Sequence, residues 1–368
     1  MHTNARLTSL RAKCLIFLFT LAVSPIGATA ADLENRLVVA NNMAGTLAII
    51  NPETWEIERY IDVATDRVAL PIPVPYADDI IVLDDGDTAI ISRPFPRDVS
   101  AYSLTSGELL WRIPTNETLG KLVPGMEYPV VGRPDHMTLG PKGKRLYVSI
   151  LNELGVVVID IASQTIIGFV LTGEGPHNVK INSDNTRGYV GHVYGDRFTE
   201  FDPQTLQVVE QHEFVEGVRP FLKLPDGEKF AMQLDKLHGF IIYDVPTKTV
   251  LKTVHLPEIN PHQADFPHTA HHGLALSGSG DRLCVAGTVS DYTAIIDYPS
   301  LERRAIVNTP GQPSWAIPSS DGKLCFVSAR KSDVVSVIDF DTGSLVSEIT
   351  LKKGSYPQRM WTGPVRIR

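Results

Sequence analysis

The sequence predicts an all-β protein, a seven-bladed β-propeller closed by one blade that both ends of the chain share. Three observations support this prediction. A phrase of about forty-two residues recurs along the chain, and each copy shows the alternation and short apolar runs of β-strands. The incomplete copies at the two ends also complement each other. A propeller is a ring of four-stranded sheets, so two partial copies can supply one blade together.

The recurring phrase contains four predicted strands. An apolar strand leads into a turn with Asp and Gly or Asn, and a second strand follows. A Ser- and Asp-containing turn then precedes a third strand that often ends in Asp, and a fourth strand completes the copy. Complete copies begin near six residues: Asp78, Asp135, His177, Arg219, His272 and Ser314. An irregular β-sandwich is the alternative, but a sandwich does not repeat a four-strand phrase in this way.

The two ends of the chain supply the seventh copy. The segment 36–63 contains a second, a third and a fourth strand but no first strand. The C-terminal segment 358–361 stands where a first strand belongs. Pairing of the two segments would close the ring and leave neither sheet edge open.

Several strand phrases resemble the YVTN repeat family of propellers. They are Arg145-Leu146-Tyr147-Val148, Val156-Val157-Val158-Ile159-Asp160 and the segment 36–42. The resemblance covers nearly all of the chain after its leader. It implies an exported propeller whose fold is similar to the haem-binding propeller of cytochrome cd-type nitrite reductases. It does not imply a particular activity, because propellers carry many unrelated functions.

The N-terminus has the three parts of a secretory signal peptide. The basic residues Arg6, Arg11 and Lys13 precede the unbroken apolar run 14–23, and a small-residue cleavage site follows at 28–30. An uncleaved membrane anchor is the alternative, but the run is shorter than the roughly 20 residues that a membrane span needs.

We therefore assign residues 1–30 to a signal peptide and residues 31–368 to a single propeller domain, which we expect in the periplasm or outside the cell. No later segment is apolar enough to suggest a membrane span. The chain carries a formal net charge of −8, and loss of the basic leader makes it more negative. An acidic chain without a basic run is a poor nucleic-acid binder, so we expect a small-molecule ligand or a periplasmic redox partner.

Two cysteines remain after the leader, Cys284 and Cys325. Each replaces the Tyr of a Leu-Tyr-Val phrase, so the repeat places them at equivalent second-strand positions of neighbouring blades. Equivalent positions of adjacent blades should lie farther apart than the roughly 7 Å Cα separation that a disulfide tolerates. We therefore expect both thiols to be reduced and buried.

The starts of all copies should meet at one end of the central channel, because the first strand of each blade lines it. The residues at these starts are polar or ionisable: Asp78, Asp135, His136, His177, Arg219, His272, Ser314, Gln358 and Arg359. Two longer insertions, 114–133 and 257–271, open onto the same face, and loop length on one face of a repeat protein often accompanies binding. His192 should also point to this face.

A first hypothesis is a metal or cofactor site. We expect His177, His268, His271 and His272 as metal ligands, with Asp135, His136 and His192 beside the cofactor. Imidazole suits copper and zinc, and haem iron takes a proximal His. The spacing matches no strong metal motif, and ordinary hydrogen bonds are the alternative role for these histidines.

Two other hypotheses use the same face. In a lactonase-like or lyase-like enzyme, His177 or His272 would act as general base while Arg219 holds a carboxylate or oxyanion. The sequence has no nucleophile elbow, which argues against a covalent hydrolase. In a non-catalytic propeller, the polar channel would hold water or a small anion.

Overall fold

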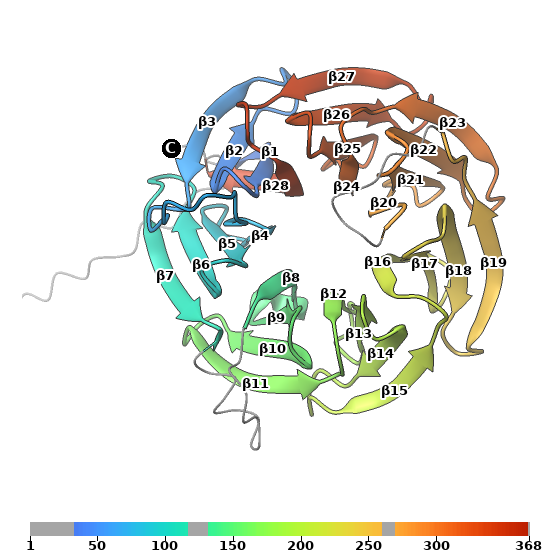
Figure 1. The fold of residues 1–368 in the computed structure, drawn as a ribbon, viewed down its shortest axis with the longest axis horizontal. Helices are drawn as coiled ribbons and strands as arrows, with labels where there is room; N and C mark the ends of the chain where they lie inside the picture. The colour runs from blue at the N-terminus through green and yellow to red at the C-terminus, as the bar shows by residue number, and fades with distance from the viewer. Residues whose placement is uncertain (1–32, 117–131, 260–268, 367–368) are drawn as a thin grey trace, which may run out of the picture.

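The computed structural model describes residues 33–116, 132–259 and 269–366. These residues form seven four-stranded antiparallel sheets arranged as blades around a central axis (Figure 1). The predicted seven-bladed propeller is confirmed. The structure contains a short 3-10 turn, η2, Pro141–Gly143, and no helix among the described residues is long and apolar enough to cross a membrane.

Each blade runs from an innermost to an outermost strand (Figure 1). The innermost strands are β4 (Asp79–Val82), β8 (Pro134–Leu139), β12 (Pro176–Ile181), β16 (Val218–Lys223), β20 (Gly273–Leu276), β24 (Pro313–Pro318) and β28 (Pro357–Arg366). The second strands are β5 (Thr88–Arg93), β9 (Arg145–Ile150), β13 (Gly188–His192), β17 (Lys229–Leu234), β21 (Arg282–Gly287), β25 (Leu324–Ala329) and β1 (Leu33–Asn41).

The two outer positions complete the blades. The third strands are β6 (Asp98–Ser103), β10 (Gly155–Asp160), β14 (Arg197–Phe201), β18 (Gly239–Asp244), β22 (Tyr292–Asp297), β26 (Val334–Asp339) and β2 (Thr46–Ile50). The outermost strands are β7 (Leu109–Pro114), β11 (Thr165–Leu171), β15 (Val208–Glu213), β19 (Thr249–His255), β23 (Arg303–Asn308), β27 (Leu345–Thr350) and β3 (Ile57–Asp62).

The ring closes as predicted, by pairing the two ends of the chain. β28 lies along β1, and their register extends from Leu33 opposite Arg366 to Asn41 opposite Pro357. The closing blade has the order β28-β1-β2-β3. A C-terminal strand thus supplies the innermost position of a blade whose other three strands are N-terminal.

The apolar core lies between neighbouring blades. Second and third strands are buried almost throughout, as in β9 and β10, because each sheet is covered on both faces by the adjoining blades. Outermost strands such as β19 are mostly exposed. This difference explains why the inner strands have near-continuous apolar runs while the outer strands alternate.

The cysteine prediction was wrong, because Cys284 and Cys325 form a disulfide between β21 and β25, with Cα atoms 6.5 Å apart. The two positions are not equivalent. Arg282 pairs with Asp297 in one blade, and Leu324 pairs with Asp339 in the next, so Cys325 sits one residue earlier than Cys284 in its strand. A shift of one residue turns a side chain to the other face of its sheet. The two thiols therefore face each other across the blade interface.

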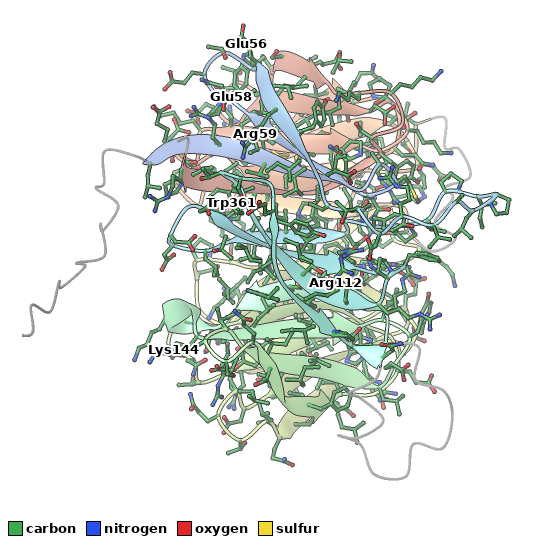
Figure 2. All side chains as sticks on the ribbon, turned by 90° about the vertical axis from the view of Figure 1, so that its left-hand side faces the viewer. Glu56, Glu58, Arg59, Arg112, Lys144 and Trp361 are labelled. Atoms are coloured by element: carbon green, nitrogen blue, oxygen red, sulfur yellow. A yellow bond between two sulfur atoms is a disulfide. The ribbon has the colours of Figure 1, made fainter. Side chains whose placement is uncertain are left out.

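The disc has two faces, which we name by the direction of the innermost strands. The entry face is where these strands begin, at residues such as Pro176 and Pro313, and the exit face is where they end, at residues such as Leu139 and Pro318. Lys144 lies at the exit face, and the segment between β3 and β4 extends from the opposite side (Figure 2).

Candidate functional site

Seven buried residues, one from the start of each blade, form a ring at the entry end of the channel. They are Asp78, Asp135, His177, Arg219, His272, Ser314 and Gln358. In one blade Pro176 lies opposite His192 and Asn178 lies opposite Gly191, so His177 is an extra residue in the ladder. Four further blades show the same shift at this point. Such β-bulges bend a strand and re-aim its side chains.

The next residue of each innermost strand forms a second row, one step deeper in the channel. This row consists of Asp79, His136, Asn178, Pro220, Gly273, Trp315 and Arg359. Proline precedes the bulge in four blades, at 134, 176, 313 and 357. A proline suits this place because it supplies no N–H to the ladder. The two rows together hold the ionisable groups of the channel entrance.

Three imidazoles from different blades meet at this level, and we call His136, His177 and His272 the three-histidine cluster. The ring centroids of His136 and His177 are 4.1 Å apart. His272 lies 5.4 Å from His177 and 6.4 Å from His136. Trp315 packs against two of them, with centroid distances of 5.2 Å to His136 and 5.8 Å to His272.

Two carboxyl groups border the cluster. Nε2 of His136 is 3.8 Å from an oxygen of Asp78 and 3.8 Å from one of Asp135, and Nε2 of His177 is 3.9 Å from the other oxygen of Asp135. One ligand atom each from Asp135, His136 and His177 lie within 4.8 Å of one another. Asn42 donates a hydrogen bond to Asp78 at 2.8 Å, which fixes that carboxylate.

Several polar atoms of this group are buried without a hydrogen-bond partner among the described residues. They are His136 Nε2, His177 Nδ1, Asp135 Oδ2 and Asp78 Oδ2. Unpaired buried polar atoms are costly and uncommon in native proteins. Their concentration at one point therefore indicates a place built to hold something polar.

Burial governs the ionisation of the cluster. Burial, and then the positive charge of Arg359, hold the pKa of His136 well below its usual range. Burial and then Arg219 do the same for His177 and His272. All three imidazoles are therefore neutral at pH 7 and can donate a lone pair to a cation or accept a proton.

The carboxyl group of Asp135 responds in the opposite way. Burial, and then the negative charge of Asp78, raise its pKa well above the usual range. Two buried carboxyl groups side by side resist holding two negative charges. A positive ion between the two carboxyl groups would offset the repulsion between their negative charges.

One backbone carbonyl and one side-chain amide lie beside the Nδ1 atoms of two of the imidazoles. Nδ1 of His272 donates to the carbonyl oxygen of Ser314 at 3.1 Å. Nδ1 of His136 lies 3.3 Å from the Asn178 amide nitrogen. The amide group of an Asn fits equally well when rotated by half a turn. In the rotated form its oxygen accepts from Nδ1–H of His136, and Nε2 then presents its lone pair toward Asp135.

Cationic side chains surround the cluster. Arg219 is held by Asp235 through a 2.5 Å hydrogen bond. The guanidinium group of Arg359 stacks on the Trp315 ring at 3.3 Å and lies 3.7 Å from Asp79. Arg219 is the charged group that lowers the pKa of both His177 and His272 most. An anion beside these two imidazoles would therefore meet a guanidinium group held in place.

The other predicted site residues are placed differently. The ring nitrogens of His192 bond to the Glu174 carbonyl at 2.8 Å and to Thr199 at 3.0 Å. Those of His271 are 3.2 Å from the Gly239 backbone nitrogen and 3.0 Å from the Tyr292 hydroxyl. Neither residue is brought to the three-histidine cluster by these contacts. His268 and most of the two insertions lie outside the described residues.

Part of the site escaped the sequence-based prediction. The entry ring follows the repeat and was predicted, but Asp79, Asn178 and Lys180 were not singled out. Trp315 belongs to an inter-blade core cluster, and it also contacts two of the imidazoles. The sequence did contain one signal of this site, the proline at the start of four blades. The bulge beside that proline turns the two residues after it toward the channel.

Comparison with known proteins identifies the fold. No protein-family model and no curated protein matches the chain. Hydrazine synthase from Kuenenia stuttgartiensis is similar in structure, with a TM-score of 0.65 and 18% identity over 83% of this chain and 93% of that one. A putative 6-phosphogluconolactonase from Bacteroides fragilis has a TM-score of 0.65 and 17% identity over 91% and 99%. At these identities the likeness shows the fold alone.

Proposed function

We propose that the entry end of the channel binds a divalent transition-metal ion through Asp135, His136 and His177, with His272 beside it. The observation that carries this proposal is the convergence of three ligand atoms within 4.8 Å in a buried place. Two imidazoles and a carboxylate form a donor set that iron, zinc and copper accept.

The observed spacing is close to that of a bound ion. Ligands about 2.1 Å from a tetrahedral ion lie about 3.4 Å from one another. Here the three ligand atoms lie within 4.8 Å of one another, so binding requires the side chains to draw together by about an ångström. The ring centroids of His136 and His177 are only 4.1 Å apart, which leaves no room between them for a haem macrocycle. We therefore favour zinc, copper or iron over haem.

The arginines favour an anionic small molecule as the ion's ligand or substrate. The positive charge of Arg219 lowers the pKa of His177 and of His272. A hydrogen bond to Asp235 fixes its guanidinium group. A guanidinium group held in this way recognises a carboxylate or phosphate. A redox-active ion at this site would fit an oxidoreductase system with a partner protein outside the cytoplasm.

The proposal is tested by metal content and metal affinity. Purified protein is expected to contain close to one equivalent of metal by mass spectrometry, and chelated protein should bind Co²⁺ with a visible ligand-field spectrum. His177→Ala should abolish both signals. His255→Ala is the matched control, because His255 is exposed on the outermost strand β19. Equal metal content in the wild type and in His177→Ala would contradict the proposal.

A metal-independent enzyme is the second candidate, and the position of Arg219 favours it. Two neutral imidazoles beside a fixed guanidinium group can accept a proton while the arginine holds an anion. A lactonase-like or lyase-like reaction uses these elements. Turnover of δ-lactones such as 6-phosphogluconolactone by chelated, metal-free protein would favour this candidate. Loss of turnover on chelation, with recovery on adding one metal, would favour the first.

We also propose that the chain is exported, as the leader at 1–30 and the resemblance to YVTN repeats imply. The disulfide between Cys284 and Cys325 supports this proposal, because disulfides persist mainly in oxidising compartments. N-terminal sequencing of protein recovered from periplasm or medium should begin near Ala31. Recovery of the intact leader in the cytoplasmic fraction would contradict export.

A further inference from the structure

A second binding place lies deeper in the channel, on the exit side of the three-histidine cluster. A cavity of about 530 Å³ extends along the innermost strands toward Leu139, Leu276 and Pro318. We call it the exit cavity. Its volume falls in the range of about 300–1,000 Å³ that is typical of small-molecule sites.

The wall of the exit cavity is mainly apolar. It includes Ile81, Met137, Leu222, Ile317 and Trp361. Figure 2 places Trp361 on the same side of the disc as Lys144, at the exit half. A wall of this kind favours a ligand with an apolar body, since burial of apolar surface from water stabilises the complex.

The cavity has few charged lining residues. Among its described lining residues the charged ones are Asp79, Lys180 and Arg359. The Asp79 carboxylate accepts hydrogen bonds from the backbone N–H groups of Met137 at 2.7 Å and Ile80 at 2.8 Å. Its lone pairs are thus partly used by the backbone, and two cations face one carboxylate.

Arg359 lies 3.7 Å from Asp79, but it keeps donors that are unused within the described part of the chain. Arg359 is 5% exposed, and its Nε and Nη2 have no hydrogen-bond partner among the described residues. Burial, and then the charge of Arg359, lower the pKa of Lys180 to about 8. An anion would satisfy the donors of Arg359 and would remove the repulsion that Lys180 experiences.

We propose that the exit cavity binds an organic anion with an apolar body, its anionic group held by Arg359 and Lys180 and its body against the apolar wall. Carboxylates of medium chain length have this chemistry. The site uses none of the proposed metal ligands, so it stands or falls independently of the metal.

The test uses decanoate as the probe and calorimetry on the full chain. Decanoate should bind to the wild type, whereas acetate, which lacks the body, and decyltrimethylammonium, which carries the opposite charge, should bind at least about 10-fold more weakly. Lys180→Met should weaken decanoate binding by about 10-fold or more, and Lys180→Arg should retain it. Lys353→Met, which removes an exposed lysine of the turn before β28, is the matched control and should bind like the wild type.

Three results would overturn the proposal. They are absence of decanoate binding up to its solubility limit, equal affinity for decanoate and decyltrimethylammonium, and an unchanged affinity in Lys180→Met. Melting curves of each variant show whether it is folded, and Lys180→Arg keeps the test meaningful if Lys180→Met does not fold. Titrations with and without bound metal separate this outcome from that of the metal proposal.

Discussion

His177 and His192 belong to the same blade and are both buried, but their ring nitrogens meet different surroundings. His192 has a hydrogen bond at each nitrogen, to Glu174 and Thr199. His177 has an Nδ1 without a hydrogen-bond partner among the described residues, and its Nε2 lies 3.9 Å from Asp135. His271 resembles His192, and His136 resembles His177.

Burial and pKa do not separate these two sets, because burial lowers the pKa of all of these histidines. What separates them is hydrogen bonding. A satisfied imidazole stabilises the blade that contains it, whereas a buried imidazole with an unused nitrogen beside a carboxyl group costs stability until a ligand binds. We therefore expect the histidines with an unused nitrogen to affect metal binding and the satisfied histidines to affect the stability of the fold.

The largest effect is expected from removal of the strand on which both sets depend. Deletion of residues 357–368 removes β28, which closes the ring against β1 and contributes Arg359 beside the cluster. We expect loss of cooperative unfolding and of metal binding together, because an open edge and an exposed channel replace the closed blade. Circular dichroism melting curves measure the first, and an unchanged melting temperature would contradict the closure.

Replacing one histidine from each set by alanine, in separate variants, tests this difference directly. Removal of an outer partner of a metal ligand costs about 10–100-fold in affinity, so His136→Ala should weaken metal binding by more than about 100-fold. His271→Ala should leave metal affinity unchanged but lower the free energy of unfolding by about 2 kcal/mol, because it strands the Gly239 N–H and the Tyr292 hydroxyl. Competition with a chromophoric chelator and urea unfolding give the two quantities.

The comparison would fail if the two variants behaved alike. Reduced metal affinity in His271→Ala, in a protein that unfolds normally, would place His271 in the site. Normal metal affinity in His136→Ala would remove His136 from it.

Acid should destabilise the fold through the buried histidines of both sets, and His192 allows one such contribution to be tested alone. Burial lowers the pKa of His192 to about 4, below the value of about 6.5 expected in the unfolded chain. Below pH 6.5 the unfolded chain therefore binds a proton that folded His192 does not, and stability falls as the pH decreases toward 4. Between pH 7 and 4.5 this amounts to about 2 kcal/mol.

His192→Gln removes this titration and keeps a donor and an acceptor. Urea midpoints at pH 7 and pH 4.5 should therefore differ less in the variant than in the wild type. An equal loss of stability in both proteins would show that His192 is not the source.

The smallest effect is expected from an outer partner of the cluster. Asn178→Leu removes the amide group 3.3 Å from His136 Nδ1 but keeps a side chain of similar volume. Metal affinity should fall by about 10-fold without a change of the fold. An affinity equal to that of the wild type would show that the amide group does not orient His136.

More of the fold than of the site could be predicted from the sequence. The repeat period located every blade and the closure, and it placed His177 and His272 in one ring because both stand at the start of their blade. Of the deeper row only His136 and Arg359 were singled out, because a strand pattern does not show where a β-bulge turns the residue after the extra one toward the channel.

The cysteines show the limit of aligning repeats by similarity. Matching Leu283 to Leu324 makes Cys284 and Cys325 equivalent, but the third-strand pairing sets the true register one residue away. A single-residue slip leaves the apolar content of a buried strand unchanged while it reverses every side-chain direction. Residue types alone therefore could not decide whether these thiols meet.

The bulge at the start of the innermost strands separates two kinds of change that evolution can make. The residue before the bulge keeps its place opposite the second strand, while the extra residue and the one after it border the channel. Five blades carry this bulge, so the residue that it presents can change one blade at a time without rebuilding the scaffold. An engineer who rewrote only Ser314 and Gln358 would be using the same freedom.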